Sequence, residues 1–416
     1  MLVEFAIKNF MSFKGEACIS MLATNTVKEG EDGSHINIIN TPNQKDKYLR
    51  VAAIYGANGS GKSNLFKAIK VFKTMVIGSY KDDKLLVKYT KSKFRFAFDE
   101  LSKEEPTDFE VTMICNGTQY RYGFEIVKDC FSSEWLFMKK ENATKESYCF
   151  IRENGNFKTN PSIMKGIKSS KEQTRDNALF LTKLALDDNE LAKEVKQGIE
   201  DINIIEGNSE NTLPYTLINA YKNSEFKKTL MGFVAKLGLG FSDIKYENLD
   251  RDDPKHLRIE SVHNVYKEGV ITRTESMPIE SESLGTLKTL AFLGPWIDTL
   301  KKGKLLVIDE FGASLHTQMA IELIKLFYSQ LNCGEAQLII ATHDTNILRK
   351  DFFRRDQVWF VEKNENAESQ LYSLVEFKVR NDATFNKDYL AGKYGAIPIF
   401  GDIQQLIEDF KLKEEV

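Results

Sequence analysis

The sequence predicts an α/β fold built around a parallel sheet, and three observations carry this prediction. From 284 to 416, apolar strand-like runs alternate with helix-like segments, the usual pattern of a parallel sheet covered by helices. The run VAAIY at 51–55 is continuously apolar and rich in strand-forming residues, as expected for a strand buried on both faces. It leads into the glycine-rich stretch GANGSGKSN and then into a segment with Leu65, Ile69 and Phe72 at helical spacing.

Patterns elsewhere predict the remaining elements. Residues 2–10 alternate apolar and polar side chains, which indicates a half-buried strand, and a second short strand is expected at 17–22. The polar stretch 25–47 is expected to be a surface excursion. Residues 93–152, starting with FRFAF, read as several strands, two of which form a hairpin across Asn116-Gly117. Residues of about 160–240 read as helices.

The order of these patterns predicts a discontinuous architecture. A chain of 416 residues allows two or three cores, at roughly 100–200 residues per domain. We expect 1–155 to form the first part of one domain, a head that carries the glycine-rich loop and an antiparallel β lobe. Residues 245–416 form its second part, and 156–244 form a helical insertion between the two.

Composition excludes several classes of protein. Lys plus Arg is 57 and Asp plus Glu is 60, so the net charge of −3 argues against coating nucleic acid or membranes by bulk charge. The five cysteines include no CxxC pair, which disfavours disulfides and cysteine zinc sites and fits a reducing compartment. No apolar run approaches the roughly 18 residues of a membrane span, and charges interrupt the N-terminal apolar stretch. A cytoplasmic location without membrane contact is expected.

The strongest chemical signal is the loop that follows the 51–55 strand. It matches GxxxxGK[ST] and lies between a predicted strand and a predicted helix, the context that this phosphate-binding motif requires. Backbone N–H groups of the loop and the helix N-terminus bind phosphates. Lys62 is expected to reach the terminal phosphates of ATP, and the Ser63 hydroxyl to bind Mg²⁺. The predicted nucleotide-binding residues of this segment are Gly56, Ala57, Asn58, Gly59, Ser60, Gly61, Lys62, Ser63 and Asn64.

Two acids follow a second buried strand. The run KLLVI ends in Asp309 and Glu310, at the carboxyl edge where open α/β sheets bind ligands. An apolar strand that ends in two acids is common by itself, and its combination with the phosphate loop favours a function. Asp309 is expected to hold the Mg²⁺ ion, and Glu310 to orient the attacking water.

Two further candidates lie near these strands. The strand QLIIAT ends in His343, a candidate sensor of the γ-phosphate, so Lys62, Glu310 and His343 are the predicted catalytic residues. Ser283 and Gly285 precede a predicted helix and are candidates for binding an anion. Helix capping by Ser283 is the alternative interpretation, and the position shortly before the Asp309 strand favours a function.

These four motifs together resemble the ABC-type ATPases, in the branch that contains RecF and SMC heads. The segment Ser283–Thr286 resembles a degenerate signature motif, and Asn9–Phe13 resembles the opening motif of such heads. The resemblance implies a P-loop NTPase head that hydrolyses ATP to ADP and phosphate. In that family the signature covers ATP bound to another subunit, which implies self-association through ATP-sandwiched heads as a homodimer or higher even oligomer. His316, in the region that resembles a D-loop with Ser314, either touches the partner's nucleotide or caps the next helix.

A closer resemblance involves longer stretches of the chain. ESLGT, VIDEFGASLH, AQLIIATHDTNIL, RRDQVWFVEKN and YLAGKYGAIP are similar to bacterial AAA-family proteins of the abortive-infection and restriction-associated type. These are AbiLi- or RloA-like and related to the ATPase subunits of the PARIS and Septu systems. The resemblance implies a sensor or regulatory subunit of an anti-phage system that controls a separate toxic effector. A nuclease is one candidate effector, and DNA or a phage protein is a candidate trigger.

Departures from the family keep an alternative open. No coiled-coil heptads separate the P-loop from the signature, and no Q-loop glutamine is evident, since Gln119 falls in the predicted hairpin. A RecF-like DNA repair or recombination ATPase is the alternative function, and a regulatory ATPase without a DNA role is a third. Partner or trigger recognition is expected in the helical segment 160–240.

Overall fold

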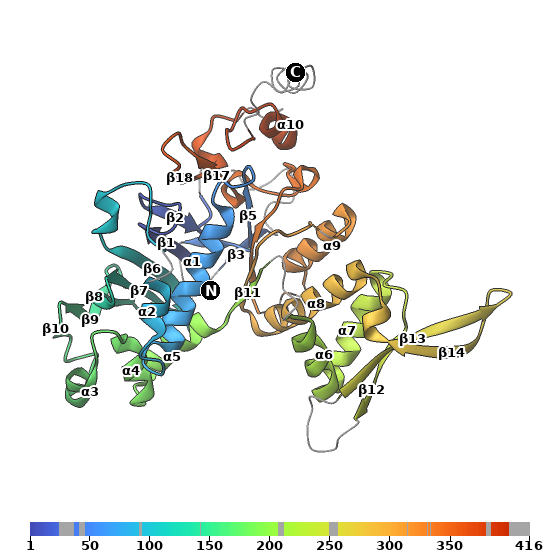
Figure 1. Ribbon diagram of the computed structural model, residues 1–416, viewed down its shortest axis with the longest axis horizontal. Helices are drawn as coiled ribbons and strands as arrows, with labels where there is room; N and C mark the ends of the chain where they lie inside the picture. The colour runs from blue at the N-terminus through green and yellow to red at the C-terminus, as the bar shows by residue number, and fades with distance from the viewer. Residues whose placement is uncertain are drawn as a thin grey trace, which may run out of the picture.

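The computed structural model describes most of the chain (Figure 1). The described residues are 1–24, 37–40, 46–90, 94–141, 143–206, 212–248, 257–313, 315–330, 332, 334–379 and 384–398. Most of the excursion expected at 25–47 lies outside them, and its described parts form the small hairpin of β3 (Ile38–Asn40) and β4 (Lys47–Leu49). None of the described helices combines the length and apolarity that crossing a bilayer demands.

The predicted parallel sheet is present. Five strands run parallel in the order β11-β15-β16-β5-β17, and β18 adds antiparallel to β17. The bounds are β11 Ile202–Ile205, β15 Leu305–Ile308, β16 Gln337–Ala341, β5 Val51–Tyr55, β17 Val358–Lys363 and β18 Ser369–Ser373. Every residue of β5, β15 and β16 is buried, because both faces of the sheet are covered.

A seven-stranded antiparallel sheet forms the β lobe, in the order β10-β9-β8-β7-β6-β1-β2. The strands are β1 Leu2–Lys8, β2 Ala17–Ser20, β6 Thr107–Cys115, β7 Thr118–Val127, β8 Cys130–Lys139, β9 Ser147–Glu153 and β10 Asn156–Thr159. The predicted hairpin is confirmed: Asn116 and Gly117, with φ of 45° and 78°, connect β6 to β7. The expected strand at 94–98 is wrong. Its backbone instead bonds the turn after β1, since Met11 N–H donates to Phe94 and the Asn9 side chain accepts from Phe96 N–H at 3.1 Å.

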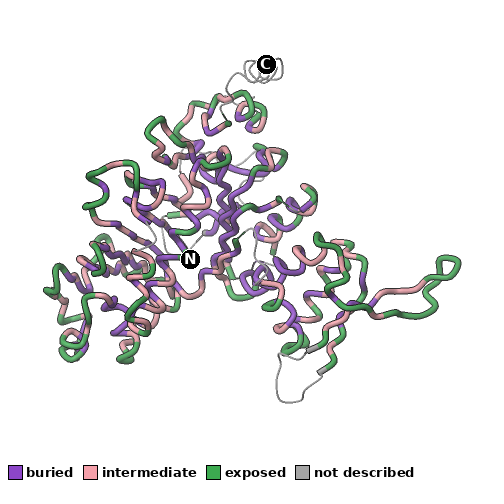
Figure 2. Tube along the Cα trace, viewed as in Figure 1, coloured by how far each residue is buried: buried purple, intermediate pink, exposed green. Residues whose placement is uncertain are grey.

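Helix α1 (Lys62–Gly78) packs between the two sheets. Its Phe72 stacks on Phe124 of β7 at 5.4 Å and meets Phe5 of β1 edge-on at 5.6 Å. Alternate residues of β5 belong to different cores: Ala52 and Ile54 join α1 in the first core, whereas their neighbours face a second core under α8 and α9. Figure 2 shows the buried segments concentrated on these strands.

The other helices cover the sheets from both sides. They are α2 Leu85–Thr90, α3 Lys168–Gln173, α4 Phe180–Leu186, α5 Glu190–Glu200, α6 Thr212–Lys222, α7 Ser224–Lys236, α8 Leu284–Lys302, α9 Thr317–Tyr328 and α10 Phe385–Leu390. Short 3₁₀ helices cover Leu101–Lys103, Ile279–Ser281, Thr345–Ile347, Arg355–Gln357 and Leu374–Glu376.

The segment 156–244 is helical with two strand exceptions. It contains α3 to α7, as expected, but β10 joins the lobe and β11 pairs in parallel with β15 of the central sheet. Residues of α4 and α5 belong to the first core with α1, whereas residues of α6 and α7 pack with α8 in the second. The segment therefore contributes to both cores of the head.

A small sheet stands apart from the others. It contains β12 (Asp243–Asn248), β13 (Leu257–Lys267) and β14 (Val270–Pro278), in that order. The β13–β14 hairpin projects from the side of the molecule beyond α6 and α7 (Figure 1). Its second strand leads directly into the 3₁₀ turn 279–281 and helix α8.

Candidate nucleotide-binding site

Three of the predicted motifs meet at one edge of the parallel sheet. Gly56 follows β5, Asp309 follows β15 and His343 comes soon after β16. These strands are direct neighbours, with Ile54 beside Ala341 and Ile340 beside Ile308. The carboxyl ends of parallel strands meet at the same edge, so the phosphate loop, the acid pair and the histidine share one site.

The phosphate loop has the backbone geometry of an anion cradle. Gly61, with φ of +117°, is the N-cap of α1, and no side chain caps this helix. The first-turn N–H groups of α1 therefore lack a side-chain acceptor and can serve an anion. The Ser60 hydroxyl is buried without a hydrogen-bond partner, an orphaned polar atom that a phosphate oxygen would satisfy. The loop fits a polyphosphate.

Lys62 is folded back onto the loop. Its ammonium donates to the carbonyl oxygens of Gly56 at 2.8 Å and Ala57 at 2.9 Å. Burial lowers its pKa to about 8, against the opposing effects of the Asp309 and Glu310 carboxylates. A polyphosphate would restore a full charge partner to this lysine.

The acid pair has an unusual backbone. Asp309 is buried, and its Oδ1 accepts the Glu310 N–H at 3.0 Å. Glu310 is exposed and has φ of 53°, in the left-handed region that non-glycine residues seldom adopt. Such outliers cluster at functional sites, and the exposed carboxylate at the edge of the sheet is accessible to a ligand.

His343 completes the edge of the site. It is exposed, yet partial desolvation and then the positive charge of Lys62 lower its pKa, and Asp309 partly opposes them. The imidazole is therefore neutral at pH 7, with one nitrogen that donates and one that accepts. Either role suits contact with a phosphate or a water beside it.

The residues present also fit Mg²⁺. Within the described ranges, no cluster of three or more His, Cys, Asp or Glu side chains forms a metal cage. Mg²⁺ does not need one, because it binds one or two protein oxygens together with phosphates and waters. The Ser63 hydroxyl and the Asp309 carboxylate are the groups that would hold it.

Two serines that sequence reasoning did not single out as site residues brace the loop. Ser369 of β18 donates to the Ser60 carbonyl at 2.5 Å and to the Ser12 hydroxyl at 2.7 Å. The Asn64 side chain also donates to Ser12, at 2.7 Å. Ser12 lies in the segment that resembles the opening motif of ABC-type heads, whereas Ser369 had no local signal, because only the pairing of β17 with β18 brings it here.

The signature region lies elsewhere on the chain. Ser283 caps α8 by accepting the Thr286 N–H at 3.1 Å, and both Ser283 and Gly285 are exposed. The neighbouring Leu284 is 69% exposed. Among the interactions of the described residues, none joins Ser283 or Gly285 to the phosphate loop of the same chain. Capping is therefore confirmed for Ser283, and its role toward an anion stays a prediction.

The region that resembles a D-loop contains a second cap. His316 Nδ1 accepts the Gln318 N–H at 3.2 Å and caps α9. This confirms the capping interpretation of His316. Ser314 lies outside the described residues.

We predict that Gly61→Ala abolishes nucleotide binding. A Cβ at Gly61 would lie 2.2 Å from the Ser369 hydroxyl and 2.7 Å from that of Ser12, in addition to the strain of a φ of +117°. The loop would have to move away from its brace. Gly59→Ala is the matched control, because its φ of +76° imposes strain but its Cβ meets nothing within 4 Å. Titration with a fluorescent ATP analogue should separate the two, and equal losses in both would contradict the brace.

The lowered pKa of Lys62 predicts a pH-dependent affinity for ATP. With a pKa of about 8 in the free protein, Lys62 loses its proton above that pH, whereas bound phosphates favour the charged form. Binding then takes up a proton, and affinity falls as pH rises, by up to about tenfold per pH unit. Calorimetry in buffers of different protonation enthalpy measures this uptake. Lys62→Arg, which stays charged, should remove the dependence; a flat wild-type profile would contradict it.

The comparisons with known proteins agree with this chemistry. The model of one family, described as "AAA domain, putative AbiEii toxin, Type IV TA system", matches residues 51–349. This range contains the phosphate loop, the acid pair and His343. No curated protein matches the chain.

Solved structures with a related fold are heads of SMC proteins. One is an SMC head bound to the C-terminal winged-helix domain of ScpA, with a TM-score of 0.48 and 18% identity over 89% of this chain and 97% of that chain. The SMC head domain from Thermotoga maritima has a TM-score of 0.43 and 17% identity over 91% and 99%. A Pyrococcus furiosus SMC head with an extended coiled coil has a TM-score of 0.38 and 16% identity over 94% and 98%.

The topology itself identifies the fold class. A strand, phosphate loop and helix beside an acid-tipped strand form a P-loop NTPase core, and the antiparallel lobe on α1 makes it an ABC-type head. Because the family model spans most of the sequence and every residue of this core site, the chain belongs to the family described as AAA domain, putative AbiEii toxin, Type IV TA system.

Proposed function

We propose that this protein hydrolyses ATP and is the sensor or regulatory subunit of a bacterial anti-phage, abortive-infection system with a separate toxic effector. The observation that carries the ATPase proposal is the meeting of Lys62, the Asp309–Glu310 pair and His343 at one sheet edge. The family description, which names an AbiEii toxin and a type IV toxin–antitoxin system, supports the defence role.

Each side chain has a distinct task in this proposal. Lys62 leaves its two carbonyl partners and binds the terminal phosphates. Bound Mg²⁺ neutralises charge on the phosphate oxygens. Glu310 orients a water for attack, and its exposed carboxylate has room for that water. The neutral imidazole of His343 hydrogen-bonds the γ-phosphate or the attacking water.

The site is composite in this proposal. Ser283 and Gly285 are exposed and lie apart from the phosphate loop of their own chain, so a second chain must supply them. Two copies related by a two-fold axis would each present a phosphate loop to the partner's signature, which gives a closed pair. The proposed assembly is a homodimer, or a higher even oligomer, with ATP between the heads.

A mixing experiment tests the composite site. Lys62→Ala loses nucleotide binding, and Gly285→Asp places a negative charge where the signature would meet a phosphate. The aspartate itself is tolerated, because a Cβ at Gly285 meets only the Ser283 hydroxyl, at 3.8 Å, and acids suit the first turn of a helix. Each variant alone should be inactive. Their equimolar mixture should regain about a quarter of wild-type ATPase activity, from mixed pairs with one intact site.

The controls keep the outcomes separate. Gly285→Ala should remain active, since it adds bulk without charge. Full activity of Gly285→Asp alone would remove the signature role while leaving the phosphate loop unaffected. No recovery in the mixture, with both variants folded by circular dichroism, would exclude a site shared between chains.

A second experiment separates the defence role from DNA repair. The net charge of −3 gives no bulk attraction to DNA, which favours the defence proposal over a RecF-like repair ATPase. Toxicity that appears only on co-expression with an adjacent gene, and disappears with Lys62→Ala, is the expected result. Tight ATP-dependent binding of the isolated protein to DNA, weakening steeply with salt, would support the repair alternative instead.

A further inference from the structure

The projecting hairpin ends its sheet with an open edge. β14 is the terminal strand of the β12-β13-β14 sheet, and its ladder partner is β13 alone among the described strands. Eight of its nine residues are exposed. An edge strand presents unpaired N–H and C=O groups and is a template for pairing with another strand.

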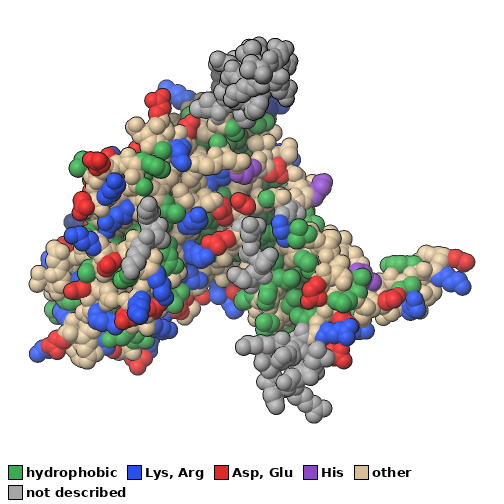
Figure 3. All heavy atoms as spheres, viewed as in Figure 1, with side chains coloured by type: hydrophobic (Ala, Val, Ile, Leu, Met, Phe, Trp, Pro, Cys, Tyr) green, Lys and Arg blue, Asp and Glu red, His purple; other side chains and the backbone are tan. Residues whose placement is uncertain are grey.

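The side chains of β14 include apolar groups that nothing covers in a single chain. Ile271 is 54% exposed and Met277 is 39% exposed. Between them lie Arg273 and Glu275, whose ion pair at 3.4 Å is itself open to solvent. Figure 3 shows apolar and charged side chains along the projecting hairpin. Successive odd-numbered residues of a strand share one face, so these four side chains form a single row, defined here as the β14 row.

The β14 row is complementary to itself in antiparallel orientation. The strand runs from Val270 to Pro278, and its central residue is Thr274. Two copies paired about Thr274 bring Arg273 opposite Glu275 of the second copy, twice. The same register places Ile271 opposite Met277, and on the other face it pairs hydroxyl side chains with hydroxyl side chains. Opposite charges, apolar pairs and threonine pairs directly across two strands are each stabilising.

Backbone hydrogen bonding agrees with this register. Along an edge strand, alternate residues direct their N–H and C=O groups outward. Pairing centred on a residue always matches odd positions with odd and even with even. The outward groups of one copy therefore meet the outward groups of the other, whichever set points outward. The register also uses the whole strand, and Pro278, which has no N–H, falls at its end opposite Val270.

We propose that β14 is a self-association edge, at which two copies of this chain join their three-stranded sheets into one six-stranded antiparallel sheet. The two-fold axis passes through Thr274. This contact needs no nucleotide and is distinct from an ATP-sandwiched pair of heads. A chain that uses both contacts builds assemblies larger than a dimer, since each contact joins a different partner.

A charge-swap experiment tests the register. Arg273→Glu places two acids opposite two acids, and Glu275→Arg places two bases opposite two bases. Each variant alone should dimerise about tenfold more weakly than wild type, because like charges directly across a ladder repel. The equimolar mixture should associate again, and so should the double variant R273E/E275R, since both restore opposite charges. Sedimentation equilibrium without nucleotide, in a Lys62→Ala background, measures this contact alone.

Cysteine cross-linking gives an independent measurement. Thr274→Cys should form an intermolecular disulfide on mild oxidation, because residues directly opposite in an antiparallel pair have Cα atoms about 4.5–5.5 Å apart. Lys245→Cys on β12, in the same small sheet, is the control and should not cross-link. A wild-type chain that stays monomeric without nucleotide, or a mixture of the two charge variants that does not associate, would overturn the proposal.

Discussion

Glu310→Gln is expected to bind ATP with wild-type affinity and to lose hydrolysis by about 10²- to 10⁴-fold, the usual contribution of a group that activates water. The substitution keeps the size and hydrogen-bonding shape of the side chain. The phosphate loop, Lys62 and Asp309 are unchanged, so the nucleotide and Mg²⁺ still have their ligands. Loss of the carboxylate removes the acceptor that orients the attacking water.

The same variant should accumulate as an ATP-bound pair. When hydrolysis cannot release the sandwich, mass action favours the associated state, and light scattering with ATP should show a larger species than for wild type. Glu335→Gln is the matched control, because Glu335 also has a left-handed backbone, with φ of 57°, and lies at the opposite end of β16 from His343. Wild-type hydrolysis rates in Glu310→Gln would remove Glu310 from its proposed role.

The sequence predicted the catalytic edge because its signals are local. The phosphate loop, the strand before Asp309 and the strand before His343 are each read within a few residues. Each of these strands is buried on both faces, so it appears as an unbroken apolar run that few other structures explain. Short-range pattern and long-range packing agree there, which is why both fold and site residues could be placed.

The sequence failed where pairing depends on distant partners. β11 covers only Ile202–Ile205, directly after helix α5, and a run this short has no periodicity of its own. It is a strand because β15 offers a ladder. The bracing hydroxyl of Ser369 was invisible for the same reason, since the hairpin of β17 and β18 places it beside the loop. Conversely, the alternating FRFAF pattern has no neighbouring strand to pair with among the described residues.

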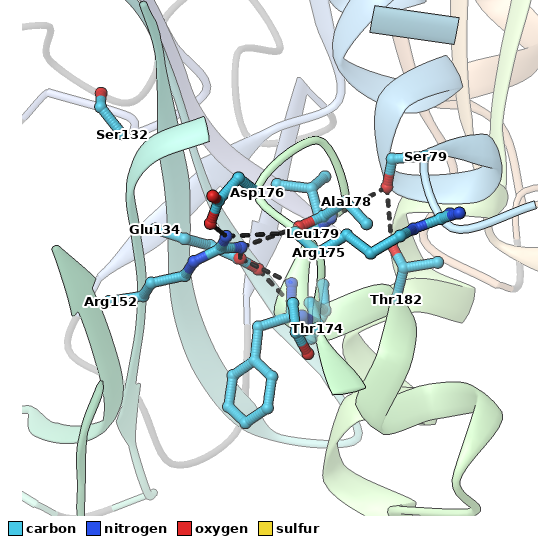
Figure 4. Close-up of polar contacts among 12 residues, drawn as sticks. Ser79, Ser132, Glu134, Arg152, Thr174, Arg175, Asp176, Ala178, Leu179 and Thr182 are labelled. Atoms are coloured by element: carbon cyan, nitrogen blue, oxygen red, sulfur yellow. Dashed lines mark hydrogen bonds and ion pairs between the residues drawn. The ribbon is translucent and has the colours of Figure 1, made fainter. Parts of the chain in front are cut away.

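A buried ion pair links the β lobe to the segment that precedes α4 (Figure 4). Glu134 of β8 is 0% exposed and Arg152 of β9 is 1% exposed, with 3.8 Å between their charged groups. Glu134 accepts the N–H groups of Phe180 and Leu181 at 2.6 and 2.9 Å, and so caps α4. Arg152 donates to the Ala178 carbonyl at 2.8 Å. The pair therefore fixes the start of α4 against the sheet.

The segment held by this pair also contacts the end of α1. The N–H of Leu179 donates to the Ser79 hydroxyl at 3.2 Å, and Thr182 donates to the Val76 carbonyl at 2.7 Å. Ser79 is the C-cap of α1, the helix that begins at the phosphate loop. Loosening the ion pair is thus expected to weaken the packing of the lobe against α1 as well as α4 itself.

Arg152→Met should lower the free energy of unfolding by about 3–5 kcal/mol, because it leaves the Glu134 carboxylate buried without its counter-charge. Burial raises the pKa of Glu134, and Arg152 opposes that rise. Without the arginine the pKa rises further, so the folded state favours the protonated acid more than the unfolded state does. Stability from this group is then present at low pH and lost as pH rises through the folded pKa. The deficit of the variant should therefore shrink as pH falls from neutral toward about 5.

Urea unfolding of wild type and variant across this pH range measures the effect. Adding Glu134→Gln to Arg152→Met should recover part of the stability, because a neutral amide keeps an acceptor for the Phe180 and Leu181 N–H groups without a buried charge. Arg349→Met is the matched control: its pair with Asp351 is exposed, and its loss should cost under about 0.5 kcal/mol. A deficit that is equal for both arginines, or that grows as pH falls, would show that the buried charge is not what Arg152 balances.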